Sequence, residues 1–476
     1  MKRLIAPLLL LSLSICFLSC FEDNDDNTVS ASQINDFVWK GMNSYYLYLE
    51  NSPDLANDRF SNTNEYASYL NSFSRPEELF ESVIYERQTI DKFSWIVDDY
   101  FELERQFEGT RGTNGLEFNF YGSPNNEINA YGVIRLVLPE SPATNTTLKR
   151  GDIIYGIDGT QLTRENIGQL INKDTYTINL GFYNDKGTPE ESDDSIDPLN
   201  VDVTLTKVLY TENPIFKTEI LNVGGENIGY LMYNGFIGNS ENQLNAIFAD
   251  FKGNNVTKMV LDLRYNPGGS VLTTAFLASM ITGQFTGQVF EKLRYNENQT
   301  NNDFDFLFYN KLQSGESVNS LGLNKVYVLA TRSSASASEG LINGLKPYIE
   351  VVHIGNNTVG KTQASRTLYD SPDFSREGVN PGHTYAMQPL IADGFNKNDE
   401  LVPGTGLTPS IGYEYNENPQ NYGVLGNRNE PMLALALADI ENATSKVNKI
   451  KSTEKHVELI LTSNDFNPLE GGNIID

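Results

Sequence analysis

A run of serines between a strand-like and a helix-like stretch is where the sequence best suits nucleophilic chemistry. Val326–Ala330 is apolar, and the serine-rich run Ser334–Ser338 leads into a helical pattern that ends near Leu345. The first N–H groups of a helix have no intrahelical acceptor, so a serine at this junction lies beside amides that can stabilise an oxyanion. Serine at a helix start is also a common cap, and position alone favours the cap.

A serine hydroxyl is a weak nucleophile and needs a base. The chain has three histidines, His353, His383 and His456, and none belongs to a recognisable triad signature. Lys361 follows the next apolar run and a turn, which return it to the same sheet edge as the serines. Burial would lower the pKa of this lysine towards neutrality and allow its amine to accept the serine proton. Taken alone, a lysine in a Gly-Lys-Thr sequence is more often a surface residue.

The same lysine also matches the spacing of a phosphate-binding loop. Gly355 and Gly360 precede Lys361 and Thr362 at the intervals of that motif. The motif requires a helix directly after the lysine, whereas the residues that follow here are β-branched and rich in serine. A formal net charge of -27 also disfavours anionic ligands. These features argue against nucleotide binding.

The regions around these residues differ in pattern. Residues 30–108 carry aromatic and aliphatic residues at helical spacing, which predicts a helical N-terminal domain. Residues 109–208 alternate as strands do, and residues 209–441 alternate apolar strands with helices, as α/β layers require. Residues 442–476 form a polar tail that we expect to be loosely held. The predicted α/β strands are 228–232, 259–263, 326–330 and 350–354, and the predicted helices lie near 243–251, 272–281 and 338–345.

Composition excludes some partners. The 476 residues allow several domains, and 62 acidic against 35 basic residues disfavour nucleic acid and anionic headgroups.

Residues 1–20 differ from the rest of the chain, because Lys2 and Arg3 precede an apolar run, which predicts a signal peptide rather than a membrane span. Both cysteines, Cys16 and Cys20, lie in this segment. Removal of the segment at Cys20 would leave no possible disulfide.

Leu18–Cys20 resembles the bacterial lipobox, although Phe17 departs from its pattern. The resemblance implies that Cys20 is acylated and anchors the chain stably to a membrane of the bacterial cell envelope. The acidic run at 21–29 would then be a solvated tether. In some Gram-negative groups such a run resembles a surface-export signal, which implies the outer membrane and, with that signal, the cell surface. An ordinary signal peptide and a plain linker are the alternatives.

Three segments in order resemble the C-terminal processing peptidase, or tail-specific protease, family: Gly229–Leu231, Val260–Gly269, and Ser334–Glu339 with Gly360 and Lys361. The resemblance implies Ser336 as nucleophile and Lys361, 25 positions later, as general base, with an acyl-enzyme and no metal or other cofactor. It implies that the oxyanion is held by the backbone N–H groups of Ala337 and of Gly268 or Gly269. In the family a glutamine four residues after the lysine often orients it. In this chain Ser365 holds that position, and Gln363 lies only two residues after Lys361. The residue that would orient Lys361 is therefore unassigned.

Residues 109–208 resemble a PDZ domain. The resemblance implies a carboxylate-binding loop formed by Gly115, Leu116, Glu117 and Phe118, beside a sheet edge that accepts a peptide as an added strand. Glu117 stands where the family has glycine, and its side chain should alternate away from those of Leu116 and Phe118.

Together the resemblances imply a multidomain α+β protein with a helical cap, a PDZ-like module and a ClpP/crotonase-like α/β catalytic core. They imply an endopeptidase that acts on extracytoplasmic peptides or proteins. The alternative is a catalytically inactive peptide-binding lipoprotein of the same fold. The oligomeric state is left open.

Overall fold

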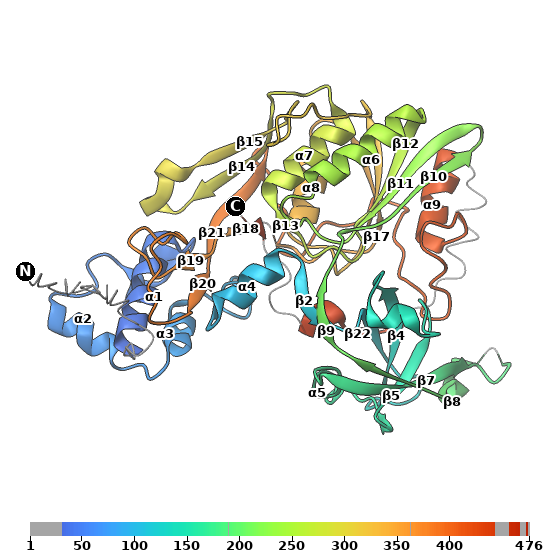
Figure 1. Cartoon of the computed structure of the whole chain (residues 1–476), viewed down its shortest axis with the longest axis horizontal. Helices are drawn as coiled ribbons and strands as arrows, with labels where there is room; N and C mark the ends of the chain where they lie inside the picture. The colour runs from blue at the N-terminus through green and yellow to red at the C-terminus, as the bar shows by residue number, and fades with distance from the viewer. Residues whose placement is uncertain (1–30, 189, 362, 443–456, 467–472, 475–476) are drawn as a thin grey trace, which may run out of the picture.

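The computed structural model describes residues 31–188, 190–361, 363–442, 457–466 and 473–474. The predicted signal peptide with Cys20 and the acidic tether at 21–29 lie outside these residues. A helical region, a β-rich module and an α/β region follow one another along the chain (Figure 1). The multidomain α+β architecture predicted from the sequence is therefore confirmed. No helix within the described ranges has both the length and the apolar character needed to cross a bilayer.

The helical region is packed onto the α/β region. It contains α1 (Ala31–Tyr45), α2 (Thr63–Leu70), α3 (Pro76–Val83), α4 (Tyr100–Phe107) and 3-10 turns at Leu49–Asn51 and Pro53–Leu55. α1 buries side chains at the spacing of an amphipathic helix, namely Ile34, Phe37, Val38 and Met42. These residues share one core with Leu368 and Met387 of the α/β region. In addition, β1 (Trp95–Val97) pairs with β20 (Ala386–Gln388), which pairs with β19 (Leu368–Tyr369).

The β-rich module is one antiparallel sheet in the order β22-β3-β4-β5-β7-β8, in which β22 is Leu459–Thr462 of the tail, with β6 paired to β5. Its strands are β3 (Leu116–Gly122), β4 (Ala130–Val137), β5 (Ile153–Ile157), β6 (Thr160–Gln161), β7 (Thr175–Asn184) and β8 (Ser195–Thr206), beside helix α5 (Ile167–Ile171) and a 3-10 turn at Pro142–Asn145. The turn at Asp158–Gly159 has positive φ at both residues, as a tight hairpin requires. β2 (Thr110–Thr113) and β9 (Val208–Thr211) pair where the chain enters and leaves the module.

The α/β region has a five-stranded sheet in the order β10-β11-β12-β16-β17, parallel except for β10. The strands are β10 (Ile215–Val223), β11 (Glu226–Tyr233), β12 (Val256–Asp262), β16 (Lys325–Ala330) and β17 (Glu350–Gly355). Residues of α6 (Glu241–Gly253), α7 (Val271–Thr282) and α8 (Ala337–Leu345) cover one face, and α9 (Pro431–Ile440) covers the other (Figure 1). Because both faces are buried, the strands are continuously apolar, which made them recognisable in the sequence.

A second sheet of the α/β region has the order β13-β23-β18-β21-β14-β15. Its strands are β13 (Gly269–Ser270), β23 (Asn473–Ile474), β18 (Gln363–Ser365), β21 (Leu390–Asn396), β14 (Val289–Tyr295) and β15 (Phe304–Leu307). β13 begins at the second glycine of the predicted pair, and β18 begins two residues after the predicted base, so this sheet borders both segments. The sequence analysis did not predict it.

The expectation of a loosely held tail is wrong for the described part of residues 442–476. β22 (Leu459–Thr462) adds an antiparallel strand to β3, and β23 joins the second sheet. A 3-10 turn at Ser463–Phe466 follows β22. The physical reason is that Ile460, Leu461 and Phe466 pack against the core of the β-rich module, so this part of a mostly polar tail has apolar surface to bury.

Candidate active site

The loop between β16 and α8 holds Ser336 in a conformation that few side chains adopt. Its φ is 60° and its ψ is -117°, outside the regions favoured by L-residues. The flanking serines fix the loop, because Ser334 Oγ donates to Leu263 O at 2.7 Å and Ser338 Oγ to Asn266 O at 3.0 Å. Ser336 Oγ itself is buried and has no hydrogen-bond partner among the described residues. Backbone strain at a buried, unpartnered hydroxyl is typical of a functional site.

Lys361 lies in the turn between β17 and β18, with 2% of its surface exposed. Burial lowers the pKa of its amine to about 7, and the negative charges of Asp91 and Glu339 partly oppose that shift. The amine lies 5.2 Å from the centre of the Phe93 ring. At neutral pH a large share of this lysine is therefore uncharged and able to accept a proton.

The Glu339 carboxylate joins the two segments that carry Ser336 and Lys361. Oε2 accepts the N–H of Ser336 at 2.8 Å and the N–H of Lys361 at 2.9 Å. Oε1 accepts the N–H of Gly360 at 2.7 Å and the hydroxyl of Thr358. Burial raises the pKa of Glu339, although these hydrogen bonds oppose the shift. The sequence analysis gave Glu339 no role; its position three residues after a helix-start serine was the available signal.

The structure brings the predicted glycine pair against the serine loop. A Cβ added to Gly268 would lie 2.6 Å from Ser336 Cβ and 3.1 Å from Ala337 N, and Gly268 has a φ of 113°. The Gly268 N–H donates to Asn266 Oδ1 at 2.8 Å, so it is engaged in this conformation. Ala337 is the first residue of α8, where an N–H has no intrahelical acceptor. Ala337 and Gly269 are therefore better placed as oxyanion donors than Gly268.

The histidines make other contacts. His353 Nδ1 lies 3.1 Å from Thr408 O on the buried side of β17, and burial lowers the pKa of its ring to about 4. His383 Nε2 lies 3.0 Å from Asp370 Oδ2. His456 lies outside the described residues. Neither described ring contacts Ser336 Oγ, which leaves Lys361 as the candidate base. Over the part of the chain that the structure describes, no group of His, Cys, Asp and Glu side chains is arranged to hold a metal ion.

Two protein-family models match the chain. The model of peptidase family S41 matches residues 227–378, and the model of the peptidase S41 N-terminal domain matches residues 33–95. The chain therefore carries peptidase S41 family domains. The first match contains Gly268, Ser336, Glu339 and Lys361, and the second contains Asp91. The sequence resemblance to C-terminal processing peptidases is thereby confirmed.

Individual S41 relatives are distant. A carboxyl-terminal-processing protease of Picosynechococcus is 26% identical over 282 residues, which are 58% of this chain and 60% of that protein. The chloroplastic carboxyl-terminal-processing peptidase 2 of Arabidopsis thaliana is 24% identical over 308 residues, 60% of this chain and 54% of that protein. The chain thus matches less than two thirds of either relative's length. The crystal structure of a Bacteroides fragilis protein described as an S41 protease has a TM-score of 0.67 and 25% identity, covering 85% of this chain and 97% of that one.

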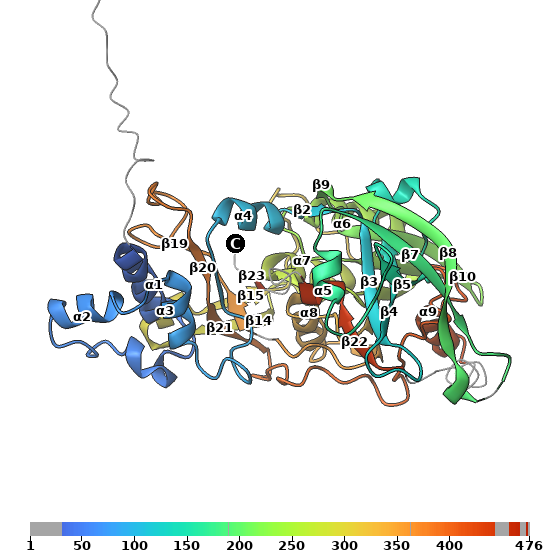
Figure 2. The ribbon, with the colours of Figure 1, turned by 90° about the horizontal axis from the view of Figure 1, so that it is seen from below.

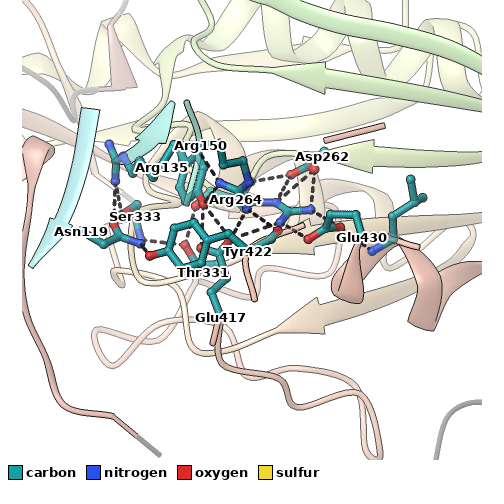
Figure 3. A network of polar contacts seen from close by, with 12 residues as sticks. Asn119, Arg135, Arg150, Asp262, Arg264, Thr331, Ser333, Glu417, Tyr422 and Glu430 are labelled. Atoms are coloured by element: carbon teal, nitrogen blue, oxygen red, sulfur yellow. Dashed lines mark hydrogen bonds and ion pairs between the residues drawn. The ribbon is translucent and has the colours of Figure 1, made fainter. Parts of the chain in front are cut away.

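In this S41 chain, buried ion pairs join the β-rich module to the α/β region (Figure 3). Arg264 is fully buried beside Asp262 at 2.8 Å, Glu430 at 2.7 Å and Glu417 at 3.2 Å. Arg150 of the module donates to the same Glu417 at 2.7 Å. Buried charges of this kind are tolerated only when paired, so the network fixes how the module meets the end of β12.

Glu117 of the predicted carboxylate-binding loop is paired as well. It lies 3.0 Å from Arg135 and 2.8 Å from Arg111, and these two charges outweigh burial and lower the pKa of Glu117. Its side chain points away from those of Leu116 and Phe118, which lie in the module core, as the strand alternation predicted. Arg135 also donates to Ser333 Oγ at 3.1 Å, in the loop that carries the candidate nucleophile.

The amides of the predicted carboxylate-binding loop are already engaged. The N–H of Gly115 donates to Thr113 Oγ1 at 3.0 Å and that of Leu116 to Asn114 Oδ1 at 3.1 Å. Gly115 has a φ of 89°, and an added Cβ would lie 1.8 Å from Ser141 Oγ. The N–H of Phe118 donates to Ser463 Oγ at 2.6 Å. In this conformation the loop amides are therefore engaged, and the β3 edge beside them is paired with β22.

Proposed function

We propose that this S41 chain is a serine endopeptidase that cleaves peptide bonds through Ser336 and Lys361. One arrangement supports the proposal. Ser336 has a strained backbone and a buried hydroxyl with no hydrogen-bond partner among the described residues, and the pKa of Lys361 is about 7. The backbone N–H groups of both residues donate to the Glu339 carboxylate, which holds their two loops together. Ser336 Oγ and Lys361 Nζ are not hydrogen-bonded to each other in this conformation. Such contacts often tighten only when substrate binds.

The proposed reaction proceeds through an acyl-enzyme. The neutral amine of Lys361 takes the proton of Ser336 as Oγ attacks the peptide carbonyl carbon, and the resulting oxyanion is held by the N–H groups of Ala337 and Gly269. Lys361 then gives the proton to the leaving amine. Water, deprotonated by Lys361, hydrolyses the ester and restores Ser336. Loss of one oxyanion donor in such sites typically slows turnover by about 10²–10³-fold.

The decisive experiment uses an unfolded protein substrate and two neighbouring serines. Ser336→Ala should abolish cleavage, whereas Ser338→Ala, which removes only the hydroxyl bonded to Asn266 O, should retain a large part of it. An acyl-trapping inhibitor should add its mass to a peptide that contains Ser336. Lys361→Arg should also be inactive because a guanidinium stays protonated. Unchanged cleavage by Ser336→Ala would refute the proposal.

We also propose that substrates are extracytoplasmic peptides that bind by strand addition at the PDZ-like module. We propose separately that a lipid on Cys20 holds the enzyme in the bacterial cell envelope, at the outer membrane. The engaged amides of the Gly115 loop favour recognition of an internal extended segment over a free carboxylate. Metabolic labelling with a fatty acid should modify the chain but not its Cys20→Ala variant. Binding of peptides without any cleavage would instead support the inactive peptide-binding lipoprotein.

A further inference from the structure

We propose that the β3 edge of the module and the gap between β13 and β18 form a peptide-binding track, which the chain's own tail segment occupies as an internal ligand. The tail segment is defined as residues 457–466 and 473–474. The inference rests on the proposed peptide-binding role of the module and extends it to a class of ligand. It does not depend on the chemistry of Ser336.

At the first site the tail segment adds a strand to β3, as Figure 2 shows for β22. Leu461 pairs with Phe120 and Thr462 with Asn119 in antiparallel register, and the N–H of Gly122 donates to Glu458 O at 3.2 Å. Strand addition to an exposed sheet edge is a general way to bind an extended peptide. Main-chain pairing of this kind accepts many sequences, so side-chain contacts must supply selectivity.

Three side chains after the strand provide such contacts. Ser463 Oγ accepts the N–H of Phe118 at 2.6 Å, and Asn464 Oδ1 accepts a hydrogen bond from Arg135. The ring of Phe466 lies 6.0 Å from the ring of Phe120, edge to face, and 3.2 Å from the position of a Cβ added to Gly168. Phe466 therefore lies between β3 and α5, in a site shaped for an aromatic side chain. The absence of a side chain at Gly168 leaves room for the ring.

The segment is also shaped internally to fit. Asp465 Oδ2 accepts the N–H of Thr462 at 2.6 Å and its hydroxyl at 2.9 Å, which closes the turn between the strand and Phe466. Arg332 donates to Leu459 O at 2.9 Å. The exposed Arg164–Glu458 pair adds little, because water screens such pairs. The expected ligand is thus a peptide with an extended apolar strand, then a turn of the type Ser-Asn-Asp, and then an aromatic residue.

At the second site β23 fills a strand-wide gap next to the candidate active site. Asn473 pairs in parallel with both Gly269 and Ala364, and Ile474 with both Ser270 and Ser365. In the described sheet, β13 is joined to β18 only through β23. β13 begins at the proposed oxyanion glycine, and β18 begins two residues after Lys361. A strand in this gap lies where a peptide strand would have to pass between the two halves of the proposed site.

Occupation in cis should mask the track from other peptides. A tethered ligand acts at an effective concentration of about millimolar, so an external peptide of similar affinity competes poorly. Weakening the tail segment alone should therefore increase binding of an added peptide. The receptor surface on β3 and α5 is unchanged in such a variant.

The experiment uses the full chain carrying Ser336→Ala, so that nothing is cleaved. A labelled peptide with the sequence of residues 457–466 should bind about tenfold or more tightly when Phe466→Ala is added to the chain. Phe182→Ala, at an exposed phenylalanine of β7 in the same module, should leave binding at the parent level. A labelled peptide that carries alanine in place of Phe466 should not gain affinity. Equal binding by the parent and Phe466→Ala chains would overturn the proposal for β3.

Hydrogen exchange tests the second site separately. A chain that ends at residue 466 keeps the described contacts with β3 but lacks β23. The Gly269 amide and those amides of Gln363–Ser365 that face β23 should exchange faster in this chain, whereas the Ser270 amide, which donates to Phe236 O, and those of β3 should not change. Unaltered exchange at both gap strands would overturn the proposal for the gap. Because neither measurement uses cleavage, their outcomes are distinguishable from failure of the proposed peptidase activity.

Discussion

Ser336 and Lys361 donate their backbone N–H groups to the same oxygen atom, Oε2 of Glu339, at 2.8 and 2.9 Å. A shared acceptor sets the distance between two loops that come from different strands of the sheet. The carboxylate is fully buried, and its remaining oxygen binds the turn just before Lys361. Glu339 therefore positions the backbone of both proposed catalytic residues without being placed to react itself.

Replacing Glu339 should impair turnover more than substrate binding. In Glu339→Gln the amide NH₂ would face N–H donors, which should push the two loops apart. A displacement of about 1 Å can cost about 10²-fold in rate, so we expect kcat to fall by about 10–100-fold while KM changes little. Steady-state kinetics on an unstructured protein would measure this. Glu350→Gln, on an exposed carboxylate at the start of β17 that pairs with Lys325 at the surface, should be neutral; equal kinetics for both variants would count against the positioning role.

The pH dependence of cleavage should report the lysine. Because only the neutral amine can accept the serine proton, and burial lowers the pKa of Lys361 to about 7, kcat/KM should rise with pH and level off above about 7. Below that value it should fall by about tenfold per pH unit. A profile measured from pH 5 to 9 would check this. A plateau that extends unchanged down to pH 5 would exclude Lys361 as the base.

Asp91 should tune that profile. Its negative charge raises the pKa of Lys361, so Asp91→Asn should lower this pKa further and shift the acid limb to lower pH. Asparagine keeps an oxygen that can accept the N–H groups of Phe93 and Ser94, which bind Asp91 Oδ1 at 3.1 and 2.8 Å. Asp36→Asn, which removes an exposed partner of Lys40, is the matched control. A limb that stays in place, or moves to higher pH, would contradict the electrostatic account.

The sequence predicted the parts of the site that depend on local pattern. Ser336 was placed correctly between a strand and a helix because the apolar run, the small residues and the helical spacing are contiguous. The turn that carries Lys361 could be placed for the same reason. Sequence position alone could not settle whether the Ser336 hydroxyl caps α8. In the structure the Ser336 N–H donates to the Glu339 carboxylate, while Ser336 Oγ is buried without a hydrogen-bond partner among the described residues.

Contacts between distant segments could not be predicted in this way. Asp91 and Phe93 approach Lys361 from the helical region because β1 pairs with β20. The strands of this three-stranded sheet are too short to leave a recognisable alternation of apolar and polar residues in the sequence. The tail was expected to be loosely held because its average composition is polar. A few apolar residues, Phe466 among them, were enough to place it on β3.

Gly268 provides the sharpest steric test of the site. In Gly268→Ala the new Cβ would lie 2.6 Å from Ser336 Cβ, and the φ of 113° is unfavourable for alanine, so the serine loop must shift. We expect cleavage to fall by about 10²-fold or more, with trapping of Ser336 by an acylating inhibitor slowed in parallel. Gly253→Ala, at the end of α6 with no atom within 4 Å of the added Cβ, should behave like the parent chain. If Gly268→Ala kept full activity, the glycine pair would not lie against the reacting serine, and the oxyanion site would have to be sought elsewhere.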